Sequence, residues 1–256
     1  MTAASPDAVL RLSGVGKSFG GIRALSDVYL TVPQSRIVGV IGPNGAGKTT
    51  LFNVITGAYR PNTGDIIFDG QAVTHWPPYR IVRAGIARTF QNIRLFASMT
   101  VWEHLLVAQP RRRGLMRNIL PVRWADAAAW TRAEEVLTFF GLEEYREVIA
   151  RTLPYGIQRK VEMARAVTAG PKLLLLDEPV AGMNHDEAAE LRALLLRLNK
   201  RGLSILLIEH DMAFVMSLCH ELYVLDFGAL IAQGDPANIR SNPAVLDAYL
   251  GSETTC

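Results

Sequence analysis

The sequence predicts an α/β fold in which helices cover both sides of a parallel sheet. Short apolar runs, typical of strands buried on both faces, alternate with longer segments whose apolar residues follow helical spacing. A glycine-rich turn follows one of these runs and an acidic turn follows another. At 256 residues the chain is long enough for one large domain, or for a domain that carries a subdomain.

The predicted core consists of strands that are each followed by a turn and a helix. The core strands are residues 36–41, 172–176, 204–208 and 222–225. The core helices are residues 48–55 and 186–200. Leu51, Phe52 and Ile55 share one face of the first helix, and Gly57 lies just past its end. Gly202 stops the second helix in the same way.

Two regions interrupt this alternation. Near the start, short β-type runs and turns predict a small antiparallel sheet beside the core. Its expected strands are residues 9–12, 28–32 and 65–69. Between about residues 92 and 153 the pattern is helical. The expected helices there are residues 101–108 and 124–140, with a short piece after Gly141.

Composition limits the classes of function. The net charge of +3 is too small to indicate a nucleic-acid-binding protein by itself. Two cysteines, Cys219 and Cys256, argue against a disulfide framework and fit a reducing compartment. The first eight residues do not have the pattern of a secretory signal. Apolar runs stay well short of the ~20 residues that span a bilayer, so any action at a membrane is expected to require partners.

The most specific motif is a loop of the pattern G-x-x-x-x-G-K-[ST] between a predicted strand and a predicted helix. It consists of Gly42, Pro43, Asn44, Gly45, Ala46, Gly47, Lys48 and Thr49, with Thr50 as a further nucleotide-binding candidate. Its glycines let backbone N–H groups converge on phosphate oxygens, and the helix directs its positive end at the same anion. Lys48 is expected on the β- and γ-phosphates of ATP, and Thr49 on Mg²⁺. The alternative is an ordinary glycine-rich turn that contains a lysine.

An acidic pair, Asp177 and Glu178, follows the apolar strand 173–176. Asp177 is placed to hold Mg²⁺, and Glu178 to polarise the attacking water as a general base. Alone, such a pair would more often cap a helix or lie in a solvated loop. About 130 residues separate Lys48 from Asp177, which is more than small GTPases and nucleotide kinases usually have and leaves room for an inserted subdomain.

With these motifs, the chain resembles the ATP-binding subunits of ABC transporters from about Val9 to its C-terminus. The resemblance implies a P-loop NTPase (RecA-like) core with a small antiparallel β subdomain and an inserted α-helical subdomain. It implies one ABC ATPase domain over residues 1–256. The expected divisions are a core of residues 1–91 and 155–230, a helical subdomain of residues 92–154 and a C-terminal helical extension of residues 231–256.

The resemblance also assigns roles to single residues. Gln91 matches the glutamine that contacts Mg²⁺ and the attacking water and senses the membrane subunit. His210 matches the switch histidine on the γ-phosphate, and Phe19 stands where an aromatic ring stacks on adenine. Taken singly, each has an ordinary structural alternative: a surface glutamine, a structural histidine and a core phenylalanine.

The family's Leu-Ser-Gly-Gly-Gln signature is altered here. The matching residues are Leu153, Pro154, Tyr155, Gly156 and Ile157, followed by a helix through residue 169. The signature binds the γ-phosphate of ATP held by the opposite subunit. Proline replaces the serine and removes a hydroxyl and an N–H, which weakens that site without disrupting a first helical turn. We therefore expect a heterodimer, in which a different subunit completes the phosphate loop of this chain. Asn184 stands where many members have aspartate, so the sequence does not decide how the two ATP sites communicate.

These departures are similar to the branched-chain amino-acid importer type, as is the segment around Gln91. This implies a second ATPase subunit, two membrane permeases and an external binding protein, with the chain at the cytoplasmic face of the inner membrane. Residues 92–99, with Arg94 and Phe96, are the expected permease-docking surface, and the alternative is a subdomain hinge. The arginines from 111 to 123 are interpreted as a solvated linker rather than a lipid-binding site.

Three other functions stay open at this point. Related importers carry urea or short amides. A soluble ABC protein would act on ribosomes or DNA, but usually has two ATPase units or long insertions. A non-hydrolysing nucleotide switch is disfavoured by Glu178 and His210.

Overall fold

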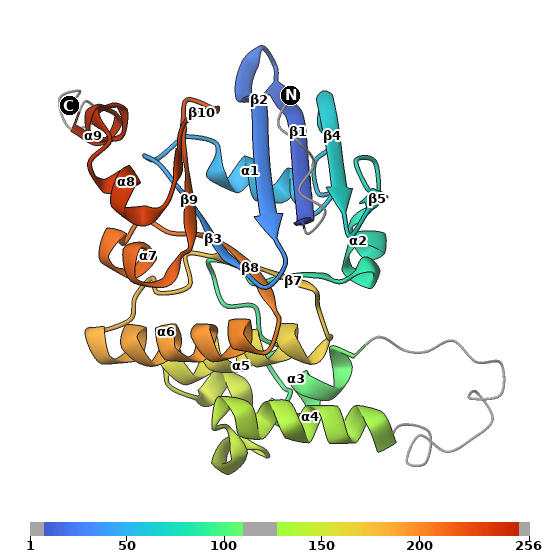
Figure 1. Ribbon diagram of the computed structural model, residues 1–256. Coiled ribbons are helices and arrows are strands. Elements are labelled where there is room, and N and C mark those ends of the chain that lie inside the picture. The colour runs from blue at the N-terminus through green and yellow to red at the C-terminus, as the bar shows by residue number, and fades with distance from the viewer. Residues whose placement is uncertain (1–7, 110–126, 251–256) are drawn as a thin grey trace. The chain divides into compact units, whose positions relative to one another are not determined.

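The computed structural model describes residues 8–109 and 127–250 (Figure 1). The arginines from 111 to 123, Cys256 and the first seven and last six residues lie outside these ranges. The chain forms two compact units, residues 1–88 with 172–256 and residues 89–171. The second unit extends past the predicted helical subdomain, 92–154, because the helix after residue 154 packs on the other helices of that unit.

The first unit contains the predicted parallel sheet. Its six strands lie in the order β10-β9-β3-β8-β7-β6. They are β3 (Ile37–Ile41), β6 (Ile86–Arg88), β7 (Leu173–Asp177), β8 (Ser204–Ile208), β9 (Glu221–Asp226) and β10 (Ala229–Gly234). All neighbours are parallel except β10, which pairs antiparallel with β9. The predicted C-terminal helical extension is therefore wrong at residues 231–234, which belong to β10.

Every residue of β3, β7 and β8 is buried, so the centre of this sheet is covered on both faces. On one face, α1 (Lys48–Ile55) contributes Leu51, Phe52 and Ile55 to a core that also contains Val38 and Val40 of β3. On the other face, Cys219 at the end of α7 (Met212–Leu218) lies against Gly39. The other helices of the first unit are α2 (Pro78–Ala84), α6 (His185–Lys200), α8 (Pro236–Arg240) and α9 (Pro243–Leu250).

A four-stranded antiparallel sheet in the order β2-β1-β4-β5 completes the first unit. Its strands are β1 (Ala8–Phe19), β2 (Ile22–Pro33), β4 (Thr63–Phe68) and β5 (Gln71–Ala72). Strands β1 and β2 are longer than predicted. Glycines interrupt the alternation of apolar and polar residues in β1, but the two strands continue to pair beyond them through several shifts of register. Buried residues of this sheet join the same core as α1.

The second unit is helical, as expected. It contains α3 (Val101–Val107), α4 (Ala127–Phe140) and α5 (Tyr155–Thr168), with two short 3-10 turns, Glu143–Tyr145 and Ala150–Thr152. Thr100 and Glu103 form a reciprocal capping box at the start of α3. The three helices contact one another, and α5 carries buried charged residues as well as apolar ones.

Candidate functional site

The phosphate loop joins β3 to α1, as predicted. Gly42 and Gly47 have φ angles of 146° and 101°. A Cβ at Gly42 would lie 2.0 Å from the carbonyl oxygen of Leu225, and one at Gly47 would lie 2.5 Å from that of Ala24. Both positions therefore need glycine for conformation and for space. A Cβ at Gly45 would meet nothing within 4 Å, so this position needs glycine for its φ of 81° and not for space.

Hydrogen bonds from two sides hold this loop. The N–H of Gly228, in the turn between β9 and β10, donates to the carbonyl of Ala46 (3.0 Å). The carbonyl of Gly228 accepts from the N–H of Ser26 in β2 (2.7 Å). The turn after β9 thus joins the phosphate loop to the antiparallel sheet.

Lys48 lies at the start of α1 and is buried. Its Nζ donates to the carbonyl oxygens of Gly42 (2.5 Å) and Pro43 (2.8 Å). Burial lowers the pKa of Lys48 below its ordinary value, and the charges of Glu178 and Asp177 oppose this shift. The ammonium and the N-terminus of α1 together present positive charge to an anion in the loop.

Asp177 and Glu178 lie at the end of β7, where register places Asp177 beside Ile208 of β8. Glu178 adopts φ 46°, an uncommon value for a residue with a side chain, and its N–H donates to the carbonyl of Ile208 (2.9 Å). This turn leaves the Glu178 side chain 23% exposed, with Oε2 3.9 Å from Nδ1 of His210. The base candidate and the switch-histidine candidate thus lie side by side.

Arg88, at the end of β6, is a site residue to which the sequence analysis gave no role. Its Nη2 donates to Oδ2 of Asp177, and its Nη1 donates to Oδ1 of Asn53 on α1, both at 2.8 Å. The side chains of Arg88 and Asp177 are only 10% and 9% exposed. A basic residue at the end of a short apolar run was the available signal, but the three residues of β6 were too few to identify as a strand.

Glu209 was also missed. Its side chain is fully buried, and its carboxylate accepts three backbone hydrogen bonds. The donors are the N–H groups of Val180 (3.0 Å), His210 (2.9 Å) and Asp211 (3.3 Å). Glu209 therefore ties the segment after Glu178 to the segment that carries His210. A charged residue directly after the buried strand β8 was the signal that could have indicated this.

Phe19, the adenine-stacking candidate, lies at the end of β1 and is 41% exposed. Its ring meets the ring of Tyr59 edge to face, with centroids 5.1 Å apart. Lys17 lies over the Phe19 ring, with Nζ 4.9 Å from the centroid. The ring is therefore held by neighbours and still accessible, and it is not a core residue.

The remaining candidates lie in the second unit. Gln91 is exposed, and its backbone is fixed by α5. The guanidinium of Arg159 donates to the carbonyls of Phe90 (2.6 Å) and Gln91 (2.9 Å), and Nη1 lies 3.0 Å from Oε2 of Glu162. Both charged side chains are buried. The backbone of the glutamine segment and the signature helix are thus joined by side chains of α5.

The signature residues Leu153, Pro154, Tyr155, Gly156 and Ile157 form the start of α5. Pro154 occupies the N-cap without a side-chain cap, and its carbonyl accepts the first helical hydrogen bond from the N–H of Gln158 (2.9 Å). The helix therefore begins normally despite the proline. Asn184 has a structural role, because its side chain and that of Glu187 cap α6 reciprocally at 2.9 Å each.

The donor set of the first unit fits a magnesium ion that accompanies a nucleotide. Within the described residues there is no cluster of three or more histidine, cysteine, aspartate or glutamate residues suited to a metal. Magnesium in nucleotide sites instead takes one or two protein ligands together with phosphate oxygens and waters. Thr49 and Asn53 are four residues apart on α1 and so share a face, and Arg88 joins Asn53 to Asp177. Thr49 and Asp177 thus border the same region.

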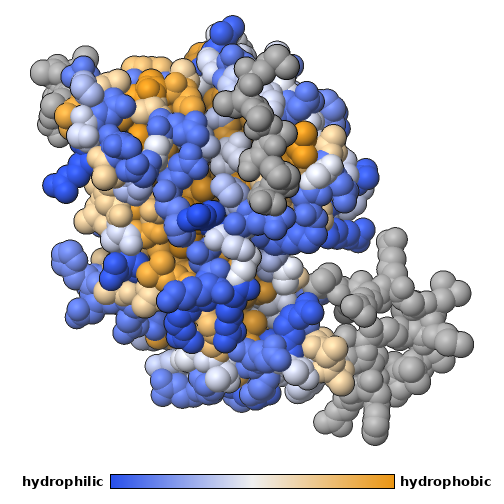
Figure 2. Space-filling view, in the orientation of Figure 1, coloured by the Kyte–Doolittle hydropathy of each residue, from blue (hydrophilic) through white to orange (hydrophobic). Residues whose placement is uncertain are grey.

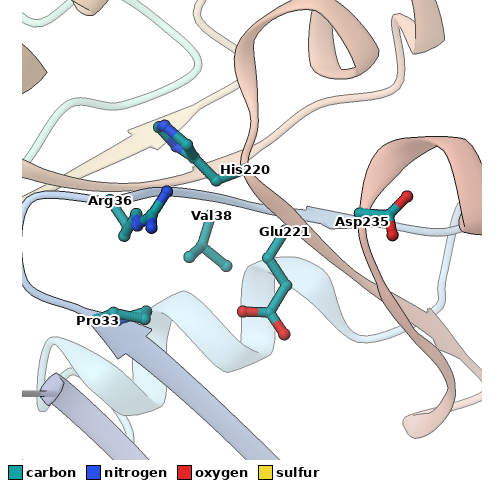
Figure 3. Close-up of a pocket in the computed structure, with 6 residues that line it drawn as sticks. All are labelled: Pro33, Arg36, Val38, His220, Glu221 and Asp235. Carbon is teal, nitrogen blue, oxygen red and sulfur yellow. The ribbon is translucent and has the colours of Figure 1, made fainter.

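A separate cavity of ≈ 320 Å³ lies near the first residues of β3 and β9 (Figure 3). It is lined by Pro33, Arg36, Val38, His220, Glu221 and Asp235. Arg36 and His220 precede the first residues of β3 and β9, whereas the phosphate loop follows the last residue of β3. The cavity is therefore not part of the phosphate site.

No helix among residues 8–109 and 127–250 is long and apolar enough to cross a membrane. The face drawn in Figure 2 mixes hydrophilic and hydrophobic residues, with hydrophilic ones over much of it.

Comparisons with known proteins agree with this geometry. Residues 25–181 match the family described as ABC transporter, and residues 229–254 match the family described as branched-chain amino acid ATP-binding cassette transporter. The high-affinity branched-chain amino acid transport ATP-binding protein BraF of Pseudomonas aeruginosa is 44% identical over 251 residues, 95% of this chain and 98% of that protein. LivG of Escherichia coli, with the same description, is 44% identical over 249 residues, again 95% and 98%.

Solved structures are similar over nearly the whole chain. The ADP conformation of an ATP-binding cassette of an ABC transporter has a TM-score of 0.85 and 32% identity, covering 95% of this chain and 99% of that one. A nucleotide-free ATP-binding cassette has a TM-score of 0.84 and 31% identity, covering 94% and 98%.

Proposed function

The chain belongs to the ABC transporter family of ATP-binding proteins, and we propose that it is the ATP-hydrolysing subunit of an importer for branched-chain amino acids. Binding and hydrolysis of ATP to power a membrane transporter follow from membership of the family. The substrate class is proposed because residues 229–254 match the branched-chain family and because BraF and LivG carry that description. These relatives do not favour a urea or short-amide importer or a soluble ABC protein.

The observation that carries this proposal is the grouping of four chemical functions in the first unit. A glycine loop and a buried ammonium, Lys48, suit the phosphates of ATP. Asp177 and Glu178 lie at the adjacent end of the sheet, with His210 beside Glu178. A cradle for phosphate, two carboxylates and a histidine together suit phosphoryl transfer to water.

We assign the hydrolytic step to these residues. The phosphates are bound and oriented by Lys48, by Thr50 and by the N–H groups of the loop from Gly42 to Gly47, except at Pro43, which has no N–H. Phe19 stacks on adenine. Glu178 accepts a proton from the attacking water, and His210 contacts the γ-phosphate. Thr49, Asp177 and Gln91 would hold Mg²⁺, and the ion would supply positive charge that offsets the negative charge of the phosphates.

A single exchange in the base tests this assignment. Glu178→Gln should abolish ATP turnover while ATP binding remains, because the amide keeps the shape of the side chain and cannot accept the proton. Glu187→Gln, the same chemical change, serves as the matched control because glutamine also completes a capping box. Turnover by Glu178→Gln at the rate of the control would contradict the role of Glu178.

The signature supports a heterodimer, in which Leu153 to Ile157 serve the ATP of the partner subunit. Pro154 offers neither a hydroxyl nor an N–H to that ATP, and one hydrogen bond to a charged oxygen is worth ~1.5–3 kcal/mol. We therefore infer that this chain's own phosphate loop is the more active of two unequal sites. Equal turnover at the two sites of the purified complex would oppose the inference.

Partners at the membrane follow from the transporter role. The family implies permease subunits, and we propose two permeases, a second ATPase and an external binding protein, with the chain peripheral on the cytoplasmic face of the inner membrane. Arg94 and Phe96 are exposed, and Arg165 of α5 fixes the Arg94 carbonyl (2.6 Å), which suits a rigid docking surface at residues 92–99.

Two experiments test the assembly. Purification of the tagged full chain from detergent-solubilised membranes should recover two permeases and a second ATPase, and the complex should take up radiolabelled leucine in vesicles supplied with ATP. Uptake of urea and not of leucine by these vesicles would contradict the substrate class. Arg94→Glu should impair assembly, whereas Arg132→Glu, an equal charge reversal at an exposed position of α4, should not.

A further inference from the structure

Arg88 binds the carboxylate of Asp177 from a position that is only 10% exposed. The guanidinium reaches Oδ2 of Asp177 with one nitrogen and Oδ1 of Asn53 with another, each at 2.8 Å. Its carbon framework packs against α1, where the guanidinium carbon lies 5.4 Å from the centroid of the Phe52 ring. The planar fork of arginine therefore holds two groups at once, one on β7 and one on α1, and joins both to β6.

This contact leaves one carboxylate oxygen of Asp177 for other use. Arg88 engages Oδ2, while Oδ1 accepts no hydrogen bond from any residue in the described parts of the chain. Asn53 is one turn of α1 beyond Thr49, so the same arginine ties the acidic strand to the helix face that carries the threonine hydroxyl. Two of the proposed ligands of a cation, Thr49 and Asp177, thus lie on elements that one side chain joins.

We propose that Arg88 is a positioning residue for the metal: it holds Oδ2 of Asp177 and thereby sets Oδ1 and the Thr49 face of α1 at the separation that Mg²⁺ requires with the nucleotide. The inference rests on the proposed function, since it deepens the assignment of Thr49 and Asp177. Arg88 itself touches neither the nucleotide nor the metal. Hydrogen-bond partners of metal ligands typically change metal affinity by about 10- to 100-fold when they are removed.

The geometry also explains why lysine would not replace arginine here. A single ammonium is a point charge with no fixed fork, so it cannot present two coplanar N–H groups to Asp177 and Asn53 at the same time. Arg88→Lys should therefore keep the charge and lose the alignment. Arg88→Met should lose both while keeping much of the apolar packing on Phe52.

The test measures ADP binding by the full chain with and without Mg²⁺. Isothermal titration or a fluorescent ADP analogue gives the affinity in EDTA and at a series of Mg²⁺ concentrations. In Arg88→Met the Mg²⁺ concentration that gives half of the affinity gain should rise about 10-fold or more, with a smaller rise in Arg88→Lys. The affinity in EDTA should stay within about twofold of the wild type, because the phosphate loop is unchanged.

Two further variants keep the test decisive. Arg83→Met removes an exposed arginine of α2 in the same unit and should leave the Mg²⁺ dependence unchanged. Asn53→Ala releases the second anchor of Arg88 while retaining both charges, and should shift the Mg²⁺ midpoint in the same direction even if Arg88→Met does not fold. A Mg²⁺ midpoint in Arg88→Lys and Asn53→Ala equal to that of the wild type would overturn the inference. Failure of the wild-type chain to bind ADP at all would instead overturn the proposed function.

Discussion

The ion pair between Arg159 and Glu162 allows a sharp prediction about stability. Both side chains are buried, at 0% and 1% exposure, and Arg159 also donates to two carbonyls of the glutamine segment. Glu162→Gln removes the negative charge and leaves the guanidinium in a fully buried site. Breaking a buried pair in this way costs ~3–5 kcal/mol, because one charge stays buried without its counter-charge.

An exposed pair in the same unit provides the matched control. Glu134 lies 2.8 Å from Arg146, with side chains 51% and 32% exposed. Glu134→Gln is the same chemical change, and an exposed pair contributes only ~0–1 kcal/mol because water screens it. The two variants differ in burial and not in chemistry.

Thermal and urea unfolding, followed by circular dichroism, measure the difference. At about 2–4 °C per kcal/mol for a chain of this size, Glu162→Gln should lower Tm by roughly 6–20 °C, and Glu134→Gln by at most ~4 °C. The double variant Arg159→Met/Glu162→Met should be more stable than the sum of its two single variants, because it leaves neither charge buried alone. Equal losses in Glu162→Gln and Glu134→Gln, at unchanged m-values, would refute the reasoning.

Three other predictions concern the first unit. Glu209→Gln replaces a carboxylate that accepts from three N–H groups with a neutral amide, so it should lower the free energy of unfolding by ~1.5–3 kcal/mol. Measured on the same preparation, ATP turnover should fall more than ADP affinity. Gly47→Ala should destabilise the chain and abolish nucleotide binding, because its Cβ would meet a carbonyl oxygen. Gly45→Ala, also at positive φ but with open space around the Cβ, should have smaller effects. Equal losses of Tm in the two variants would count against the steric argument. Burial raises the pKa of Cys219 to about 12. Because this folded-state pKa lies above the unfolded value, the contribution to stability is complete below about pH 8.5 and is lost as pH rises toward 12. In a Cys256→Ser chain, the thiol should react with a disulfide reagent at pH 8 only after unfolding, and rapid labelling of the native chain would contradict this.

The elements that the sequence predicted well are those with local causes. The helix at residues 48–55 has the same bounds in the structure, because a glycine loop starts it, an apolar face runs through it and Gly57 follows it. The strand predicted at residues 172–176 lies one residue later, at 173–177, because its run of four leucines stands between a proline turn and an acidic turn. In the structure, Lys48, Asp177 and His210 lie at or beyond the carboxyl ends of three strands of one sheet, β3, β7 and β8.

The features that the sequence did not reveal depend on partners that are distant in the chain. Arg88 and Asp177 are 89 residues apart, and Arg159 and the Phe90 carbonyl are 69 apart. A charged residue in an amphipathic segment is normally solvated, so Arg88, Arg159 and Glu209 gave no sign of burial on their own. Strand β6 has three residues and helix α7 has seven, so neither is long enough for its spacing of apolar residues to predict an element.

The turn at Gly228 has a consequence for the order in which this protein matures. Its hydrogen bonds to Ala46 and Ser26, and the close approach of Gly42 to Leu225, complete the phosphate loop with residues that are translated about 180 positions later. Chains emerge from the ribosome N-terminus first, and contacts so far apart form slowly. The motif that stands near the start of the gene therefore acquires its final shape near the end of synthesis, and a nascent chain should remain unable to retain nucleotide until its last strands have docked.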